Sequence, residues 1–372
     1  MKKVIVTLLC FATLFAWSES VACTSAIVTA AKSSEGVPML WKHRDWRLAN
    51  SFVKHMDSGK YAYTAVVSGA NKSKSVYAGI NESGFGIINT ATKNLPKSSE
   101  EEYKACERKQ IGTTTMWHKA LRTCASVDEF EEILRTTKRR HKFNTNIAVA
   151  DATGAVAYFE IWDLDYRRYD ATERAEGFDV RANFSFAGNA EKRGTSTRRY
   201  DVVMQEMSNH KGVFAPQDFL RYSRSYSSCE YGDVLANNDE YICDNYTIPR
   251  ATTTGVFVLV CDAKCPRMLV EIGHSVPGVA VPVYVKAKYQ IPECVGGKAM
   301  ENLSKEFMSK AYHKVEKKSV LQKEVVRKVL KIKQPKIEMP KEMPADMVAF
   351  NAKIDKAFSK HDKRVRRVLA KY

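Results

Sequence analysis

The residues around Cys23 constrain this chain more than any other segment. Two lysines precede an apolar run from Val4 to Trp17, and a short stretch with small residues then ends at Ala22. A basic start, an apolar segment and small residues before a cut site are typical of a secretory signal peptide. The sequence therefore predicts a signal peptide over residues 1–22, cleavage after Ala22, and a secreted or periplasmic protein that begins at Cys23.

A mature chain that begins at Cys23 carries a thiol and a free α-amine on one residue. An α-amine has a pKa of about 8, so it can act as the base that activates the neighbouring thiol. Two other interpretations stay open, an ordinary half-cystine and a lipidated cysteine behind a bacterial signal sequence. Ser20 stands three residues before the cut, where lipidation usually favours Leu. Lipidation would also acylate the amine and remove the proposed base.

Length and charge divide the chain into two parts. Removal of residues 1–22 from the 372-residue sequence leaves 350, enough for one large domain or two smaller ones. No later run of 18 apolar residues predicts a membrane span. The net charge of +17 is concentrated after residue 294, where 21 Lys and Arg face 9 Asp and Glu. We expect no nucleic-acid partner, because no binding motif accompanies this excess. Solvated basic helices or contact with an anionic surface such as a membrane or cell wall would explain it.

The number of cysteines fits an oxidising compartment. Loss of Cys10 with the signal peptide leaves seven besides Cys23, namely Cys106, Cys124, Cys229, Cys243, Cys261, Cys265 and Cys294. Three disulfides and one free thiol would use them with Cys23 set aside for chemistry, whereas all eight can pair if Cys23 is a half-cystine. The sequence does not fix the connectivity, and Cys106 with Cys124 or Cys229 with Cys243 are examples of local pairs.

Strand-like and helix-like segments alternate along the main part of the chain. Thr24–Ala30 and Val37–Lys42 predict a hairpin around a turn-like Ser-Ser-Glu-Gly. Apolar spacing over residues 115–137 predicts a helix that Ser126 and Glu129 divide with a capping box. This order favours an α+β, layered-sheet architecture, and we expect no cofactor because no glycine-rich nucleotide motif occurs.

The pattern changes near residue 300. Apolar residues recur about every four positions, through Leu303, Phe307, Ala311 and Val315 and again after Leu321, and three prolines then precede a last helix from Met347. We therefore divide the chain into a signal peptide over 1–22, a main domain over 23–295 and a basic helical C-terminal extension over 296–372. The extension is expected to pack on the main domain or to bind a partner.

Four groups of short motifs follow the cut site in order. A Cys-Thr pair at Cys23 is followed about twenty residues later by a basic-x-x-Asp pattern that ends at Asp45. The segment AGINESGFGIINTAT contains Asn89, NIAVADATGAVAYFEI has the pattern of paired strands, and VRANFS with GTSTRRYD contains Asn183 and Arg199. Together they resemble the N-terminal nucleophile (Ntn) hydrolases. The similarity is greatest to the branch of acyltransferases and linear-amide hydrolases that includes isopenicillin-N acyltransferase, penicillin V acylase and choloylglycine hydrolase.

This resemblance implies a four-layer αββα Ntn-hydrolase sandwich over residues 23–295, followed by the helical extension. It also implies roles for seven residues: Cys23 as nucleophile, Asp45 holding its α-amine, Asn89 and Asn183 as oxyanion donors, Arg199 as a nearby positive charge, and Lys42 and Arg44 as substrate-binding residues. The family has Arg at the position of Lys42 and usually Gly at that of Trp41. Arg44 is therefore either a substitute for that Arg or incidental.

The sequence thus predicts a secreted amidase that hydrolyses a linear amide through a Cys23 thioester. Its substrate is expected to be a small-molecule N-acyl amide, and acyl transfer in place of hydrolysis stays open, as does a homo-oligomer. No His-Glu-x-x-His motif or clustered metal-ligand spacing predicts a metal. One alternative belongs to another class, a surface binding protein that is anchored by a lipidated Cys23 and docks through its basic tail on an anionic partner.

Overall fold

Two antiparallel β-sheets form the centre of the computed structural model, which describes residues 22–46, 50–69, 75–237, 246–315 and 318–372. The predicted signal peptide lies outside these residues except for Ala22. The six-stranded sheet has the order β12 (Phe178–Arg181), β1 (Cys23–Val28), β2 (Met39–Asp45), β15 (Thr253–Val260), β16 (Arg267–Ile272) and β17 (Val281–Tyr284). The seven-stranded sheet has the order β11 (Tyr166–Asp170), β10 (Val156–Trp162), β9 (Asn144–Ala150), β6 (Gly86–Ala91), β5 (Val76–Asn81), β4 (Tyr63–Ser68) and β3 (Ser51–Met56).

Alternation along β1 and β2 directs side chains into two different cores. Ile27 and Leu40 belong to an apolar cluster that includes residues of the seven-stranded sheet. Ala26 and Trp41 instead pack in a second cluster with Phe219 and other helical residues. Because successive strand residues point to opposite faces, the odd-numbered residues of β1 and the even-numbered residues of β2 face the other sheet. The predicted hairpin is confirmed, with Ile27 opposite Leu40 in the register.

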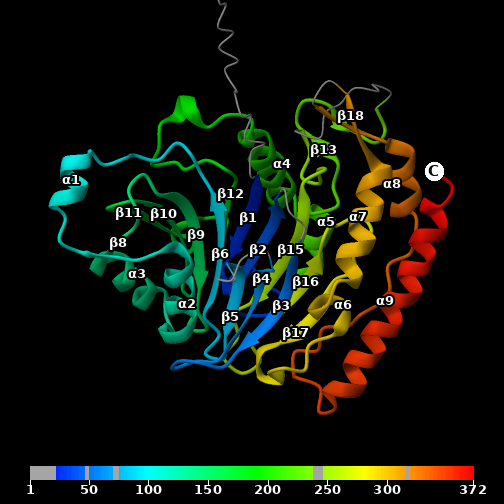
Figure 1. Ribbon diagram of the computed structural model, residues 1–372, viewed down its shortest axis with the longest axis horizontal. Coiled ribbons are helices and arrows are strands. Elements are labelled where there is room, and N and C mark those ends of the chain that lie inside the picture. Colours follow the sequence, from blue (N-terminus) through cyan, green and yellow to red (C-terminus); the bar gives the residue numbers. More distant parts are fainter. Residues whose placement is uncertain (1–21, 47–49, 70–74, 238–245, 316–317) are drawn as a thin grey trace, which may run out of the picture.

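Helices cover the outer face of each sheet, as Figure 1 shows. On the seven-stranded sheet lie α2 (Thr113–Thr123) and α3 (Val127–Thr136), and on the six-stranded sheet lie α4 (Ser196–Ser208) and α5 (Pro216–Tyr222). The predicted four-layer αββα arrangement is therefore confirmed. The shorter elements are α1 (Glu100–Ala105), β7 (Lys109–Gln110), β8 (Thr137–Lys138), β13 (Ser227–Ser228) and β14 (Gly232–Asp233).

The predicted break between the two helices of the outer layer is also confirmed. Ser126 is the N-cap of α3, and its side chain accepts a hydrogen bond from Glu129 N at 3.1 Å. The Glu129 carboxylate in turn accepts from Ser126 N at 3.2 Å. This capping box satisfies backbone donors that a helix start would otherwise leave unpaired.

The C-terminal segment contains a strand hairpin that the sequence pattern did not predict. Its elements are α6 (Glu293–Gly296), α7 (Ala299–Ala311), β18 (Tyr312–Val315), β19 (Lys318–Leu321), α8 (Lys323–Leu330) and α9 (Met347–Leu369). The predicted helix was wrong in continuing to Val315, which lies in β18. Tyr312 is buried at the switch from helix to strand, and its hydroxyl lies 3.0 Å from that of Tyr226 and 2.9 Å from His274 Nε2. These tertiary contacts override the four-residue apolar rhythm.

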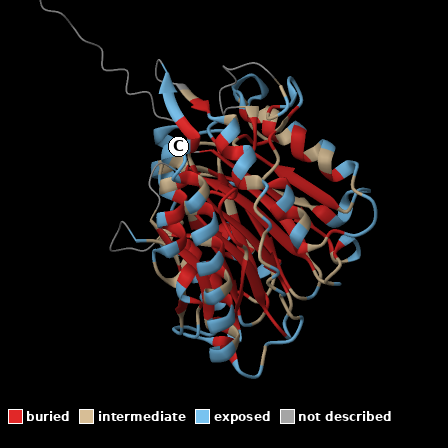
Figure 2. Cartoon of the chain, turned by 90° about the vertical axis from the view of Figure 1, so that its right-hand side faces the viewer, coloured by how far each residue is buried: buried red, intermediate tan, exposed pale blue. Residues whose placement is uncertain are grey.

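The C-terminal helices share the apolar cluster that lies between the two sheets. Their members of this cluster include Leu303, Phe307, Val325, Val329, Ile354, Phe358, Val365 and Leu369. Figure 2 shows the result, with a pale exposed stripe along α9 and buried residues on its inner side. No helix among the described residues is long and apolar enough to span a membrane. The extension therefore completes the core of the sandwich on this side.

A matched pair of valines on α9 tests whether the extension is part of the main core. Val365 is fully buried, whereas Val348 is 67% exposed. We expect Val365→Ala to lower the free energy of unfolding by about 2 kcal/mol, because two buried methyl groups and their packing are lost. Val348→Ala should change it by less than about 0.5 kcal/mol. Denaturant unfolding of the full chain measures both, and equally small effects would contradict the shared core.

Candidate active site

Cys23 begins β1 with its backbone nitrogen bound by a side chain. Cys23 N donates to Asn183 Oδ1 at 2.6 Å, and Asp45 N donates to Ala22 O at 2.8 Å. This nitrogen belongs to the Ala22–Cys23 peptide and stands in for the α-amine that cleavage would release. Cys23 is 4% exposed and Ala22 is 1% exposed. The bond predicted to be cleaved therefore lies within the folded sheet.

The Cys23 side chain faces the seven-stranded sheet together with Lys42 and Arg44. Cys23 shares the odd-numbered face of β1 with Ser25, whose hydroxyl lies 2.8 Å from that of Tyr158 on β10. In the register of the hairpin, Cys23 lies opposite Arg44, and Ser25 lies opposite Lys42. Antiparallel pairing thus brings three of the predicted site residues to one side of the sheet.

Lys42 connects the two sheets next to Cys23. Its Nζ donates to Asn89 Oδ1 on β6 at 2.6 Å and to Tyr77 O on β5 at 3.2 Å. Burial lowers the pKa of Lys42 to about 8, although the charge of Cys23 opposes this shift. The structure therefore brings Lys42 and Asn89 together. Because Asn89 Oδ1 accepts from the ammonium, its Nδ2 points elsewhere and keeps its capacity to donate.

Arg44 lies between aromatic rings on the same face. Its guanidinium carbon is 3.8 Å from the centre of the Tyr77 ring and 5.5 Å from that of Trp46, and its Nη1 donates to Thr254 Oγ1 at 2.5 Å. Burial lowers the pKa of Arg44, and interaction with Tyr77 and Cys23 opposes the shift. A guanidinium held beside aromatic rings in this way has donors suited to a carboxylate or carbonyl.

Arg199 contacts the same strand from the opposite side of the sheet. From α4, its Nη1 donates to Cys23 O at 2.7 Å and to Thr24 Oγ1 at 2.6 Å, and its Nη2 donates to Asn183 Oδ1 at 2.8 Å. Burial lowers the pKa of Arg199 to about 10. Arg199 therefore fixes the Cys23 carbonyl and orients the Asn183 amide, and it lies where the sequence placed a positive charge.

Asn183 accepts hydrogen bonds at Cys23, whereas the family resemblance implied an oxyanion donor at this position. Its Oδ1 receives both Cys23 N and Arg199 Nη2, while its Nδ2 donates to Ala91 O at 2.7 Å. Because Cys23 N and Arg199 Nη2 both donate toward the same point, the Asn183 amide must place its oxygen there and not its nitrogen. In the structure Asn183 therefore holds the nitrogen of Cys23, a role that the sequence analysis gave to Asp45.

Asp45 lies on the opposite face of the sheet from the Cys23 side chain. Its Oδ1 accepts from Thr253 Oγ1 at 2.9 Å and lies 3.4 Å from His43 Nε2, and its Oδ2 is 4.0 Å from Arg250 Nη1. Burial raises the pKa of Asp45, but His43 and nearby arginines outweigh burial and hold the pKa below its ordinary value. Asp45 therefore contacts the Cys23 strand through its backbone N–H, which donates to Ala22 O. Its carboxylate lies with His43 and Arg250 on the outer face of the sheet.

Sequence reasoning missed several partners of the predicted residues. They are His43, Tyr77, Thr253 and Thr254. Strand alternation within Lys-His-Arg-Asp at 42–45 could have predicted that His43 is a partner of Asp45. It places these two residues on one face of the strand and Lys42 and Arg44 on the other. The two threonines come from β15, more than 200 residues away in sequence, and only the sheet order brings them near.

The described residues contain no group of three or more His, Cys, Asp and Glu that could hold a metal ion. Cys106 and Cys124, one of the local pairs that the sequence left open, are both free thiols. Cys124 is buried, and burial raises its pKa to about 11. Cys229 is also a free thiol, and Cys243, its partner in the other local pair, lies outside the described residues.

Comparison with known proteins finds similar solved structures but no matching protein family and no matching curated protein. A variant of the conjugated bile acid hydrolase from Clostridium perfringens matches with a TM-score of 0.46 and 11% identity over 73% of this chain and 94% of that chain. Penicillin V acylase from Agrobacterium tumefaciens matches with a TM-score of 0.43 and 12% identity over 71% and 86%. The Caenorhabditis elegans ortholog of N-acylethanolamine-hydrolyzing acid amidase matches with a TM-score of 0.40 and 15% identity over 64% and 92%. The fold assignment rests on the strand order and layers of this chain itself.

The buried ammonium of Lys42 predicts a stability effect that depends on pH. The pKa of Lys42 is lowered from 10.5 to about 8 in the folded chain. Between these values the unfolded chain binds more protons, so stability from this group rises with pH by up to about 1.4 kcal/mol per pH unit. We expect Lys42→Met to be more stable than the wild type near pH 7 and to lose that advantage toward about pH 10. Urea unfolding across this range measures the difference, and a gap independent of pH would contradict the buried cation.

Proposed function

We propose that this protein is an N-terminal-cysteine amidase of the Ntn type, a hydrolase of linear amide bonds whose nucleophile is Cys23. The setting of Cys23 carries the proposal. Its side chain faces Lys42 and Arg44 on one side of β1, while its nitrogen is bound by Asn183 at the end of the strand. A nucleophile that carries its own base needs this arrangement, because the thiol must meet the substrate while the amine stays within reach of a proton.

The proposed reaction proceeds through a thioester. The neutral α-amine of Cys23 takes the thiol proton, and the sulfur attacks the amide carbonyl carbon to form a C–S bond. The resulting ammonium gives its proton to the leaving nitrogen as the C–N bond breaks. Water then attacks the thioester with the same amine as base, which releases a carboxylic acid and restores the thiol. An acceptor amine in place of water would give acyl transfer.

The side chains on the inner face are suited to stabilise the oxyanion and to bind the substrate. Asn89 keeps Nδ2 as a donor while Lys42 holds its oxygen, and the ammonium adds positive charge beside Cys23. A preorganised donor of this kind typically contributes about 3 kcal/mol to the transition state. Arg44, held by Tyr77 and Thr254, offers a guanidinium to a carbonyl or carboxylate of a small N-acyl amide.

Maturation of the proposed enzyme requires cleavage before Cys23, and secretion through the predicted signal peptide would supply it. Both residues of the Ala22–Cys23 peptide are buried, and its carbonyl and N–H are both bonded. A signal peptidase needs an extended, accessible segment. Cleavage after Ala22 is therefore expected on the unfolded, translocating chain, before β1 pairs with β2.

The same burial disfavours a lipid anchor on Cys23. A diacylglycerol on its sulfur would have to enter the space between the sheets, where Lys42 and Arg44 are also buried. The two long acyl chains of a diacylglycerol, unlike the acyl group of a small amide, do not fit beside these buried charges without unpairing them. A lipid-anchored binding protein would need the first strand to leave the sheet.

Cys23→Ala should abolish amide hydrolysis. We expect activity on a panel of N-acyl amides to fall by roughly 10⁴-fold or more, because no other group can form the thioester. Intact mass and N-terminal sequence of the exported protein should show a start at free Cys23, and rapid quenching should show an acyl adduct on the wild type alone. A lipidated Cys23, or a start at another residue, would overturn the mechanism.

Asn89 and Asn183 should fail in different ways when each is changed to Ala. Asn89→Ala is expected to lower kcat by about 10²- to 10³-fold with little change in KM, because it removes an oxyanion donor. It should leave alkylation of Cys23 by iodoacetamide unchanged. Asn183→Ala should instead alter the pH dependence of that alkylation, because it frees the amine that acts as base. Identical effects of the two changes would contradict the separate roles.

A further inference from the structure

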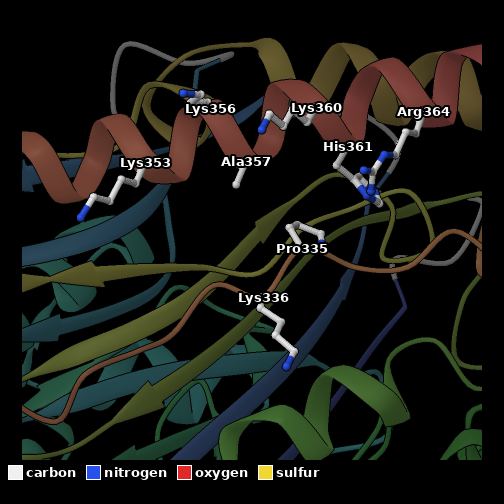
Figure 3. Close-up of a pocket in the computed structure, with 8 residues that line it drawn as sticks. All are labelled: Pro335, Lys336, Lys353, Lys356, Ala357, Lys360, His361 and Arg364. Atoms are coloured by element: carbon white, nitrogen blue, oxygen red, sulfur yellow. The ribbon is translucent and has the colours of Figure 1, made fainter.

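A cavity of about 270 Å³ lies beside α9, and six of its eight lining residues have basic side chains. Its basic side chains are Lys336, Lys353, Lys356, Lys360, His361 and Arg364. Figure 3 shows that all but one come from α9 and that Lys336 comes from the segment across the cavity. No carboxylate lines it, and none of the predicted active-site residues does. The cavity is therefore separate from Cys23 and strongly positive.

The two acidic residues of α9 do not line this cavity and make their hydrogen bonds to other groups. Asp355 accepts from the backbone nitrogens of Glu293 at 3.1 Å and Cys294 at 2.9 Å, which caps the start of α6. Asp362 accepts from Arg366 Nε at 2.9 Å. α9 contains no other Asp or Glu, so its four Lys and Arg residues that line the cavity outnumber the acidic residues of the helix.

His361 supplies an independent sign of a ligand. It is 2% exposed and lines the cavity, and its Nε2 lies 3.2 Å from Pro277 O. A carbonyl only accepts, so Nε2 carries a hydrogen. Nδ1 is buried and has no hydrogen-bond partner among the described residues. A buried polar atom without a partner is costly, and an acceptor in the cavity would satisfy a protonated Nδ1.

We propose that this cavity binds an oxyanion of the phosphate or sulfate type. Lys353, Lys356, Lys360 and Arg364 recur every three or four residues and so share one face of α9 over roughly 16 Å. Their side chains surround the anion, and His361 Nδ1 donates to it from the buried wall. A free phosphate ester and the headgroup of an acidic phospholipid present the same chemistry to these groups.

Binding of the anion should be coupled to protonation of His361. Burial lowers the pKa of this ring, and Arg224 and Arg364 lower it further, whereas Asp362 and the Pro277 carbonyl raise it. Lys336 adds positive charge from across the cavity. A bound dianion reverses this balance and raises the pKa, so the anion should bind more tightly as the pH falls.

Calorimetric titration of the full chain with sulfate, at constant ionic strength, tests the site. Sulfate stays a dianion across the range where His titrates, which separates protein protonation from ligand protonation. K356Q/K360Q should weaken binding by roughly tenfold or more. The control K363Q/R367Q removes the same charge from exposed residues of α9 that do not line the cavity, and it should bind like the wild type. Equal weakening in both variants, or no saturable binding by the wild type, would overturn the proposal.

Two further arms identify the role of His361 and the source of the anion. Wild-type affinity for sulfate should rise several-fold from about pH 7.5 to 5.5, and H361Q should lose this rise while its amide still donates to Pro277 O. A wild-type affinity independent of pH would overturn the role of His361.

Co-sedimentation with phosphatidylcholine vesicles, with and without phosphatidic acid, distinguishes a lipid headgroup from a soluble ester as the source of the anion. Binding to the acidic vesicles that K356Q/K360Q abolishes identifies a lipid headgroup, whereas binding of free sulfate alone identifies a soluble ester.

Discussion

Backbone pairing of β1 with its two neighbours sets the geometry on which the candidate site depends. β2 places Lys42 and Arg44 beside the Cys23 side chain, and β12 leads directly into Asn183, which holds the Cys23 nitrogen. Strand alternation then separates the predicted site residues between the two faces of the sheet. The inner face collects the groups that would meet a substrate, and the outer face collects Arg199 and Asp45 as supports.

Burial of so many charges in one place is costly, and the structure offsets the cost with specific partners. Lys42 and Arg199 are both depressed in pKa by burial, yet each makes two or more hydrogen bonds to oxygens of neighbouring strands. Such a network holds its members in one arrangement, because the loss of any partner leaves a buried charge unpaired. Stability is therefore reduced locally at the place where the chemistry is proposed, as is common for functional sites.

The C-terminal extension combines an apolar packing face with an excess of basic residues, and both are visible in its sequence. Its apolar residues enter the core between the sheets, and five of its Lys and Arg residues line one cavity beside α9. The four-residue rhythm predicted the helices and their packing face. It did not predict the hairpin at Tyr312–Leu321, because the buried hydroxyl contacts of Tyr312 with Tyr226 and His274 involve residues distant in sequence.

The sequence alone predicted layered sheets and the break at Ser126, because alternation and capping are local patterns, while the four-layer αββα class followed from the resemblance to the Ntn hydrolases. It also directed attention to Cys23 through a local pattern, the cut site before it. It also selected Lys42, Arg44, Asn89, Asn183 and Arg199, which the fold brings around Cys23 or its neighbours on β1 and β2. Only the tertiary structure decided what each side chain does. Which atom of an Asn faces Cys23, and which face of a strand Asp45 occupies, depend on partners from other strands and helices. Sequence spacing does not encode those partners, because sheet order and helix packing bring them together from distant parts of the chain.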